Sequence, residues 1–539
     1  MPGYDPVMAA SLAPGRRRGK NITNATLPQN LTWSVSSKRR WVNLRPYDYF
    51  TDDFYTSGIS TVVLAGTAAV TAQHGVLTMT SSAAGDRALI YPDVELKVPM
   101  FTMWIDIDSY SGDATEERYY LGLWQSVVSV DSTPYIRGQY NHSSGYFVVD
   151  QFIGGTTTTL VNVQISGLAP KRILVTFEGN NTITIWYDEG NGPVFVGSGQ
   201  QTAFELRDPA VLATLTPALR LVTDSGSMVL SGYGLSEIGG MGMRDQCIVT
   251  YANGEPYIRD GWLYFTATLP LPSSPGSGGN FVFETQHAGV FRYNLGSGEI
   301  EQTGALWFNR DSSGTTLVMN DYAMHLVIDE HAGMFRFVTT SWADSYTNSS
   351  RILYGTSYAN VLHGSHVLDA AFLTNLPSTN GHYEDASMVL KNGIWYVAYI
   401  DIITPGGADY YPTLASTTDF SAFTQVWQVT TYTEPVEGAR IQRVGGVDYV
   451  MYGGATTHPL FAFADGSLVG VLAYPFNTAY KPHPALAAVP SQAGSRYVIL
   501  TFDGDEGAWA ADGYMTGNHY VLEAAETVDG FEYPRELLG

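Results

Sequence analysis

Five ionisable residues recur at matching points in the second half of this chain, each directly before an alternating apolar stretch. They are Asp245, Asp321, Glu384 or its neighbour Asp385, Glu437 and His483. Any one of them alone would be read as a solvated turn residue. Carboxylates that converge on one cavity repel one another and raise at least one pKa, which is the arrangement that general acid and base chemistry uses. The five residues therefore predict an acidic site, provided that the fold brings their strands to a common centre.

The elements that would position these residues repeat five times. Each unit has the polar head, an alternating apolar run, a Gly-containing turn and an aromatic strand, as in YEDASMVL followed by NGIWYVAY. Alternation with period two indicates strands with one buried face, and five such hairpins with further strands between them predict a five-bladed β-propeller. The heads would begin the innermost strands and face the central channel. We therefore expect residues 241–539 to form a propeller with a C-terminal tail.

The context of the heads resembles the arabinanase and β-xylosidase-type five-bladed glycosidases and the related fructan-hydrolysing propellers. The matching segments are RDQCIV, NDYAM and YEDASMVLKNGIWY, and the similarity spans about residues 244–502. It implies that Asp245 is the general base of an inverting glycosidase and that Glu384 is its general acid. Asp321 would be the carboxylate that tunes and orients the catalytic groups. It also implies a central ion, often calcium, near His483. The reaction itself requires no cofactor.

Two alternatives stay open within this site. The proline that follows each acid in the family is absent from all three segments. Since neighbouring residues on a strand point to opposite faces, Asp385 competes with Glu384 for the inward position. Glu437 heads another motif of the same kind, so Asp245, Asp385 and Glu437 form an alternative triad. Outside a catalytic role, we assign Asp385 and Glu437 to substrate binding.

Aromatic side chains near the heads are candidates for stacking on sugar rings. We assign Trp342 and Trp395 to substrate binding, although most aromatic residues of propeller blades pack between the blades. Cys247 lies on the strand that Asp245 begins, but no pattern of His or Asn residues around it marks a nucleophile. We expect Cys247 to be a small buried hydrophobic residue.

Upstream of the repeat, residues 46–240 consist of short alternating segments such as FTMWIDID and GYFVVDQF. They predict antiparallel strands with one buried face and hence a β-sandwich. In RILVTFEG-NN-TITIWYD, Asn180 and Asn181 suit the left-handed positions of a hairpin turn. The order of segments resembles laminin-G and concanavalin-A-like jelly rolls, which implies either a sugar-binding face or an inert spacer. The expected fold class is all-β, a lectin-like jelly-roll sandwich followed by a five-bladed propeller.

Charge and composition exclude several function classes. The formal charge of −23 would repel nucleic acid, and no apolar run is long enough to insert into a membrane. The first forty residues are basic, have Asp5 as their single acid, and lack the apolar region of a secretory signal. They predict either a solvated, disordered arm or an extended segment that docks on an acidic partner, and we assign residues 1–45 to an extended docking arm. A single cysteine forbids an intrachain disulfide, which favours synthesis in a reducing cytoplasm.

A basic arm, a lectin-like sandwich and a propeller in one chain resemble phage minor tail and receptor-binding proteins. The resemblance implies a virion tail component, made in the host cytoplasm, that binds cell-surface polysaccharide and meets other tail proteins through its arm. Tail spikes commonly form trimers, so a homotrimer is one expectation, although no heptad seam supports it. Two other functions stay open. One is an active glycoside hydrolase that degrades arabinan or a similar polysaccharide, and the other is an extracellular adhesin without a virion role.

Overall fold

The computed structural model describes residues 33–39, 43–45, 48–52, 54, 59–83, 85–112, 117–179, 181–240, 242–270, 286–311, 316–342, 350–378, 380–403, 409–432, 434–444, 447–454, 457–473, 482–491, 494–502 and 519–525. Over these ranges the chain is almost entirely β-strand, and α2 (Pro209–Leu212) is a single helical turn. No helix in the same ranges has both the length and the apolar character to cross a membrane. The predicted all-β fold class is confirmed.

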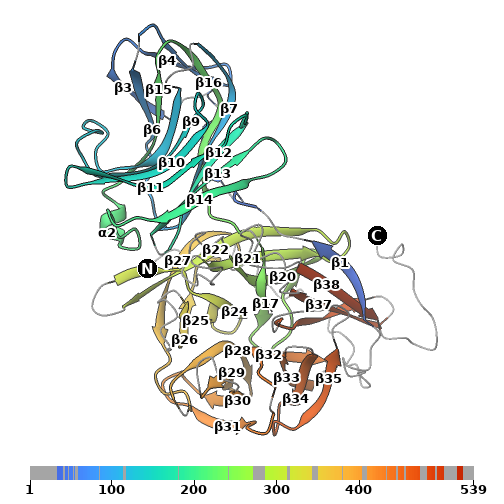
Figure 1. Ribbon diagram of the computed structural model, residues 1–539. Helices are drawn as coiled ribbons and strands as arrows, with labels where there is room; N and C mark the ends of the chain where they lie inside the picture. The colour runs from blue at the N-terminus through green and yellow to red at the C-terminus, as the bar shows by residue number, and fades with distance from the viewer. Residues whose placement is uncertain are drawn as a thin grey trace.

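Two antiparallel sheets form a sandwich in the first half of the chain, coloured blue to green in Figure 1. One sheet has the order β11-β10-β9-β8-β15-β6-β3 and consists of β3 (Ile59–Ala65), β6 (Asp86–Pro92), β8 (Arg118–Trp124), β9 (Tyr135–Asn141), β10 (Tyr146–Ile153), β11 (Thr156–Gln164) and β15 (Thr216–Thr223). The other has the order β14-β13-β12-β7-β16-β5-β4, with β2 paired to β16, and consists of β2 (Asp48–Asp52), β4 (Ala69–Gln73), β5 (Val76–Ser81), β7 (Phe101–Gly112), β12 (Arg172–Phe177), β13 (Thr182–Asp188), β14 (Val194–Gln200) and β16 (Gly226–Glu237).

The inward side chains of the two sheets make the sandwich core. Ile105, Leu121 and Leu219 are among its fully buried members, and they come from strands with the predicted alternation. The predicted hairpin is confirmed, since β12 pairs antiparallel with β13 and Asn181 adopts a φ of 63°. Asn tolerates this left-handed conformation better than most residues do.

Five blades make a propeller whose innermost strands contact one another in a closed ring, β17-β24-β28-β32-β36 and back to β17. The first blade consists of β17 (Arg244–Ile248), β20 (Trp262–Leu269), β21 (His287–Asn294) and β22 (Ile300–Asp311), with the short β19 (Ile258–Arg259) and β23 (Thr316–Met319). The second consists of β24 (Tyr322–Asp329), β25 (Met334–Thr340), β26 (Ile352–Ser357) and β27 (Gly364–Phe372), joined by β18 (Thr250–Tyr251).

The third blade consists of β28 (Tyr383–Lys391), β29 (Ile394–Ile402), β30 (Tyr410–Thr417) and β31 (Thr424–Gln428). The fourth consists of β32 (Glu437–Val444), β33 (Val447–Gly453), β34 (Thr457–Ala462) and β35 (Leu468–Ala473). The fifth contains β36 (Ala485–Ser491), β37 (Gly494–Phe502) and β38 (His519–Ala525). Its fourth strand comes from the other end of the chain.

That fourth strand is β1 (Ser34–Arg39), which pairs antiparallel with β38 and lies at the edge of the fifth blade in Figure 1. The predicted docking arm over residues 1–45 therefore needs a correction, because residues 34–39 are an outer strand of the propeller. The strand is short, and three of its six residues are exposed while the other three are half-buried, as the edge of a sheet allows. Residues 1–32 of the predicted arm lie outside the described residues.

Because β1 precedes the sandwich in sequence, the sandwich is inserted into the propeller. Asn43 and Gly240, at the entry and exit of the insertion, exchange two backbone hydrogen bonds of 3.1 and 3.0 Å. One apolar cluster crosses between the modules and includes Trp104 and Trp186 of the sandwich and Trp307 of β22. These three indoles are at most 2% exposed, so the two modules share buried surface.

Candidate functional site

The innermost strands of the first four blades share a β-bulge close to their first residue. In each, two residues lie opposite one residue of the neighbouring strand, and the first of the two has a positive φ. These residues are Asp245 (55°), Ala323 (56°), Asp385 (56°) and Gly438 (64°). Positive φ is unfavourable for most residues, so its recurrence indicates that the packing of the blades imposes it. The repeat makes Asp245 and Asp385 structural equivalents.

Each preceding blade holds the amide of the next left-handed residue. Thr268 accepts a hydrogen bond from the Ala323 N–H at 3.2 Å, and Thr340 accepts one from the Asp385 N–H at 2.9 Å. The left-handed residue of the fourth blade is Gly438, and its N–H donates to the carboxylate of Asp385 in the third blade at 3.1 Å. Asp385 Oδ2 is thereby held in place from the fourth blade.

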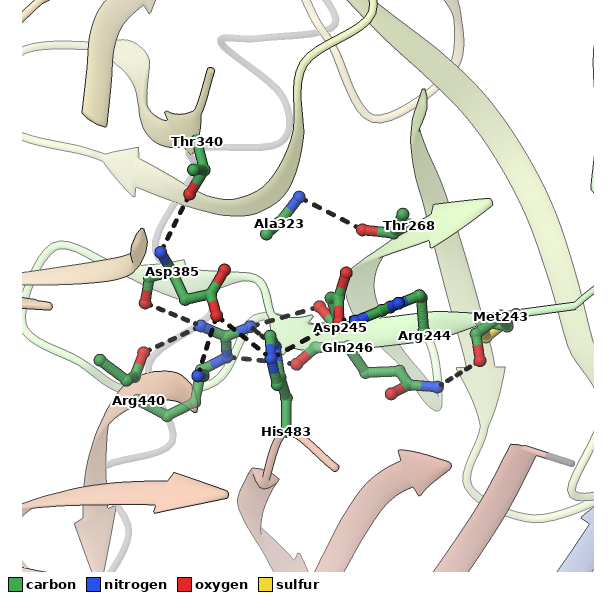
Figure 2. Close-up of polar contacts among 12 residues, drawn as sticks. Met243, Arg244, Asp245, Gln246, Thr268, Ala323, Thr340, Asp385, Arg440 and His483 are labelled. Carbon is green, nitrogen blue, oxygen red and sulfur yellow. Dashed lines mark hydrogen bonds and ion pairs between the residues drawn. The ribbon is translucent and has the colours of Figure 1, made fainter. Parts of the chain in front are cut away.

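Asp245 and Asp385 converge on one imidazole at the centre of the propeller, as Figure 2 shows. His483 Nε2 lies 3.5 Å from Asp245 Oδ1 and 3.3 Å from Asp385 Oδ2. All three side chains are nearly inaccessible. A Cβ on Gly438 would lie 2.3 Å from Cγ of His483, so a glycine is needed there to admit the ring. The site is thus assembled from the first, third, fourth and fifth blades.

The tautomer of His483 follows from its other ring nitrogen. Arg440 Nη2 lies 3.0 Å from His483 Nδ1, and a guanidinium has no acceptor, so Nδ1 accepts this hydrogen bond. The ring proton then resides on Nε2, which faces the two aspartates. The single N–H of the ring is therefore on the side of the two carboxylates.

Charges around the pair keep Asp385 ionised. Burial raises the pKa of Asp385, but His483, Arg440 and the Gly438 amide outweigh it and hold that pKa below its ordinary value. Arg244 Nε donates to Asp245 Oδ1 at 3.0 Å, so Asp245 also has a cation beside it. Burial raises the pKa of the Cys247 thiol to about 11, which makes Cys247 a poor nucleophile at neutral pH.

The residue before each left-handed position lies at the end of the propeller where the innermost strands begin, which we call the head end. Arg244, Tyr322, Glu384 and Glu437 occupy these four positions. Arg244 and Glu437 are partly exposed. Glu384 is 7% exposed, and Ser350 donates a 3.1 Å hydrogen bond to its Oε1. Of these four, Arg244 donates to Asp245, and Glu437 has a carboxylate oxygen within 4.8 Å of the ligand atoms of Asp385 and His483.

Several residues predicted from the sequence lie elsewhere. Asp321 forms a fully buried ion pair with Arg310, with 3.0 Å between Oδ2 and Nε. Trp395 pairs with Leu390 near the opposite end of the third blade and packs on Phe420. The structure does not bring Asp321 or Trp395 to the side chains around His483.

Trp342, by contrast, lies at the head end. It follows β25 and stacks on Tyr322, with ring centroids 6.1 Å apart and planes 17° from parallel.

Asp385, rather than Glu384, takes the position equivalent to Asp245, and Glu437 stands one residue before the corresponding Gly438. Sequence reasoning missed Arg440, Arg244 and Gly438. An alignment of the first four units on their bulges would have placed Gly438 at the position equivalent to Asp245.

The residues do not fit the calcium ion implied by the resemblance. Asp385, Glu437 and His483 each offer a ligand atom, and these atoms lie within 4.8 Å of one another. Calcium takes about 6–8 oxygen ligands, whereas this set has two carboxylates and a nitrogen. The nitrogen that faces the carboxylates carries the ring proton, because Arg440 occupies the other one. No step of the chemistry is therefore assigned to a metal.

The arrangement can bind and polarise a neutral, hydroxyl-rich ligand. Ionised carboxylates accept hydrogen bonds from hydroxyl groups, and Trp342, which is the partly exposed member of its stack with the buried Tyr322, lies at the same end. Asp245 Oδ1 and Asp385 Oδ2 both contact His483 Nε2, so the separation of these two oxygens cannot exceed the sum of their distances to that nitrogen. That limit admits the about 5–5.5 Å of a retaining carboxyl pair and the short end of the about 6.5–9.5 Å of an inverting pair.

No protein-family model matches the chain, and no curated protein matches it. Among solved structures, the chain is similar to Zg3597, a family 117 glycoside hydrolase of Zobellia galactanivorans, with 10% identity, a TM-score of 0.38 and coverage of 55% of this chain and 90% of that one. It is also similar to Bacillus subtilis levansucrase, with 10% identity, a TM-score of 0.37 and coverage of 53% and 86%. The carbohydrate-binding module CBM66 of Bacillus subtilis covers 33% of this chain and 92% of its own, with 11% identity and a TM-score of 0.23. Similarity at this level does not assign an activity.

Proposed function

We propose that this protein binds a polysaccharide at the head end of its propeller, through Asp245, Asp385 and the partly exposed Trp342. The observation that carries the proposal is the convergence of two equivalent aspartates on His483. Four blades hold their geometry, Arg244 donates a hydrogen bond to Asp245, and Arg440 and His483 help to lower the pKa of Asp385. Preorganised acceptors beside an aromatic surface are what recognition of a sugar ring requires.

The binding test compares two substitutions in the first blade. Asp245→Asn removes the charge at the centre, whereas Asp260→Asn makes the same change in an exposed turn residue with a nearly identical φ of 53°. Immobilised arabinan, arabinogalactan and bacterial cell-wall polysaccharide serve as ligands, and bound protein is measured. Loss of a hydrogen bond to a charged group costs about 1.5–3 kcal/mol, so Asp245→Asn should weaken binding roughly tenfold or more. Equal binding by both variants would refute the proposal.

Glycoside hydrolysis is a second candidate, favoured by the closeness of the two carboxylates. Because its pKa is lowered, Asp385 suits the role of base, nucleophile or charge stabiliser rather than that of general acid. Reducing sugar released from the same polysaccharides tests this candidate. Release by the wild type that disappears in both Asp245→Asn and Asp385→Asn would support it, and binding without release would reject it.

A place on a phage tail is the finer part of the proposal. It is supported by the order of the modules, in which a sandwich is inserted into a propeller and joined to it by buried tryptophans. Such a body would display two surfaces towards a host cell-wall polysaccharide, and other tail proteins would be contacted through the N-terminal residues. Labelling purified virions with antibody against the propeller tests this placement. Label on the tail is expected, and virions that lack the protein would exclude it.

A further inference from the structure

The centre of the propeller contains a cation that belongs to the chain. Arg440 lies on β32 and is 1% exposed. The equivalent residues of the first three blades are Cys247, His325 and Ser387, none of which carries such a fixed charge. A buried guanidinium is costly unless each of its donors is satisfied. The partners of Arg440 therefore decide what it does.

The five N–H groups of this guanidinium match five acceptors in four blades. Nε donates to Gln246 O at 3.2 Å, and Nη2 donates to Asp245 O at 3.2 Å and to His483 Nδ1 at 3.0 Å. Nη1 donates to Ala439 O at 2.8 Å and to Asp385 O at 3.4 Å. Four of the acceptors are backbone carbonyls of the bulges, as Figure 2 shows for Arg440. Carbonyl oxygens gathered in this way would otherwise offer ligands to a metal ion.

Charge balance at the centre agrees with this geometry. Arg244 donates to the Asp245 carboxyl group, and the charge of Arg440 lowers the pKa of Asp385, so each aspartate already has a guanidinium group of the chain beside it. A divalent cation would add two charges in a space from which water is largely excluded. It would also need the nitrogen of His483 that now carries the proton.

We infer that Arg440 is the axial cation of this propeller and takes the place of a metal ion. It joins the first, third and fourth blades through their bulge carbonyls and the fifth blade through His483 Nδ1. The last contact fixes the Nε2–H tautomer of His483, whose N–H then faces Asp245 and Asp385 and leaves no lone pair there for a metal. Arg440 is thus a positioning residue, and the Asp385, Glu437 and His483 group binds no divalent ion while Arg440 is present.

The first test uses the unmodified chain. After chelation, the protein is titrated with Ca²⁺, Mn²⁺ and Zn²⁺ separately, and bound metal is measured by mass spectrometry and calorimetry. We expect no stoichiometric ion at the centre. Tight binding of one ion per chain that is lost in His483→Gln would overturn the inference. In parallel, ¹⁵N spectra of the histidine rings should show His483 with an unprotonated Nδ1, the resonance being assigned by its loss in His483→Gln. A protonated Nδ1 would equally overturn it.

The second test removes the guanidinium. Arg440→Met frees Nδ1 to take the ring proton and leaves Nε2 available to a metal, so Zn²⁺ should bind about 10–100-fold more tightly than to the wild type. His483→Gln in the same background should abolish the gain. A folded Arg440→Met variant without any gain would contradict the inference. Neither test involves a glycan, so failure here is distinguishable from failure of the proposed binding function.

Discussion

Gly438 is the position at which a single added methyl group should reveal how tightly the centre is built. Its φ of 64° is left-handed, and a Cβ there would lie 2.3 Å from Cγ and 2.4 Å from Cδ2 of His483. The ring cannot move aside easily, because Arg440 holds Nδ1 and the ring is 1% exposed. Gly438→Ala should therefore destabilise the propeller through backbone strain and through overpacking.

The two contributions can be separated with a matched glycine. Gly333, in the turn after β24, has a φ of 65°, and a Cβ there would meet no atom within 4 Å. Gly333→Ala should cost only the left-handed strain of about 1–2 kcal/mol. Gly438→Ala should cost that amount plus about 1–3 kcal/mol for overpacking. Gly438→Ala combined with His483→Ala should lose much of the additional cost, since the ring that the methyl group strikes is gone.

Urea unfolding followed by intrinsic fluorescence measures these differences, with the propeller transition fitted separately if the two modules unfold in separate steps. The expected order of stability is wild type, Gly333→Ala and then Gly438→Ala. A difference of less than about 0.5 kcal/mol between the two alanine variants would refute the reasoning, because it would mean that His483 does not pack against Gly438.

Two further predictions concern the closure of the propeller and the sandwich core. Removal of residues 1–39 deletes β1 and the packed Trp33 from the fifth blade, so it should lower the melting temperature by several degrees relative to removal of residues 1–32, which keeps both. Equal melting temperatures of the two truncated chains would mean that β1 does not close the blade. Burial raises the pKa of Glu178 to about 8 from 4.5, so its contribution to stability is present below pH 4.5 and is lost as the pH rises towards 8, by at most about 1.4 kcal/mol per pH unit. In urea unfolding across pH 4.5–8, Glu178→Gln should flatten the dependence of the free energy of unfolding on pH. Glu330→Gln, at an exposed position, should keep that dependence. An unchanged slope in Glu178→Gln would show that Glu178 does not titrate in this way.

The architecture was predictable because it depends on local periodicity. Alternation of apolar residues specifies strands with one buried face, and Asn181 in the turn specifies the hairpin between β12 and β13. The five repeated units predicted the blades in the same way. The role of residues 34–39 was not predictable, because an exposed edge strand carries little periodic signal and its partner β38 lies nearly five hundred residues away.

The sequence by itself therefore determined the all-β class, the two modules, the number of blades, and the approximate positions of Asp245, Asp385 and His483. Only the tertiary structure decided which acids meet. The bulge brings Asp385 rather than Glu384 into line with Asp245, and Arg310 takes Asp321 into a separate buried pair. It also placed Arg440 on the axis, where five acceptors from four blades surround it. The physical reason is that a left-handed residue and a shared acceptor depend on neighbours distant in the chain, which local residue patterns do not record.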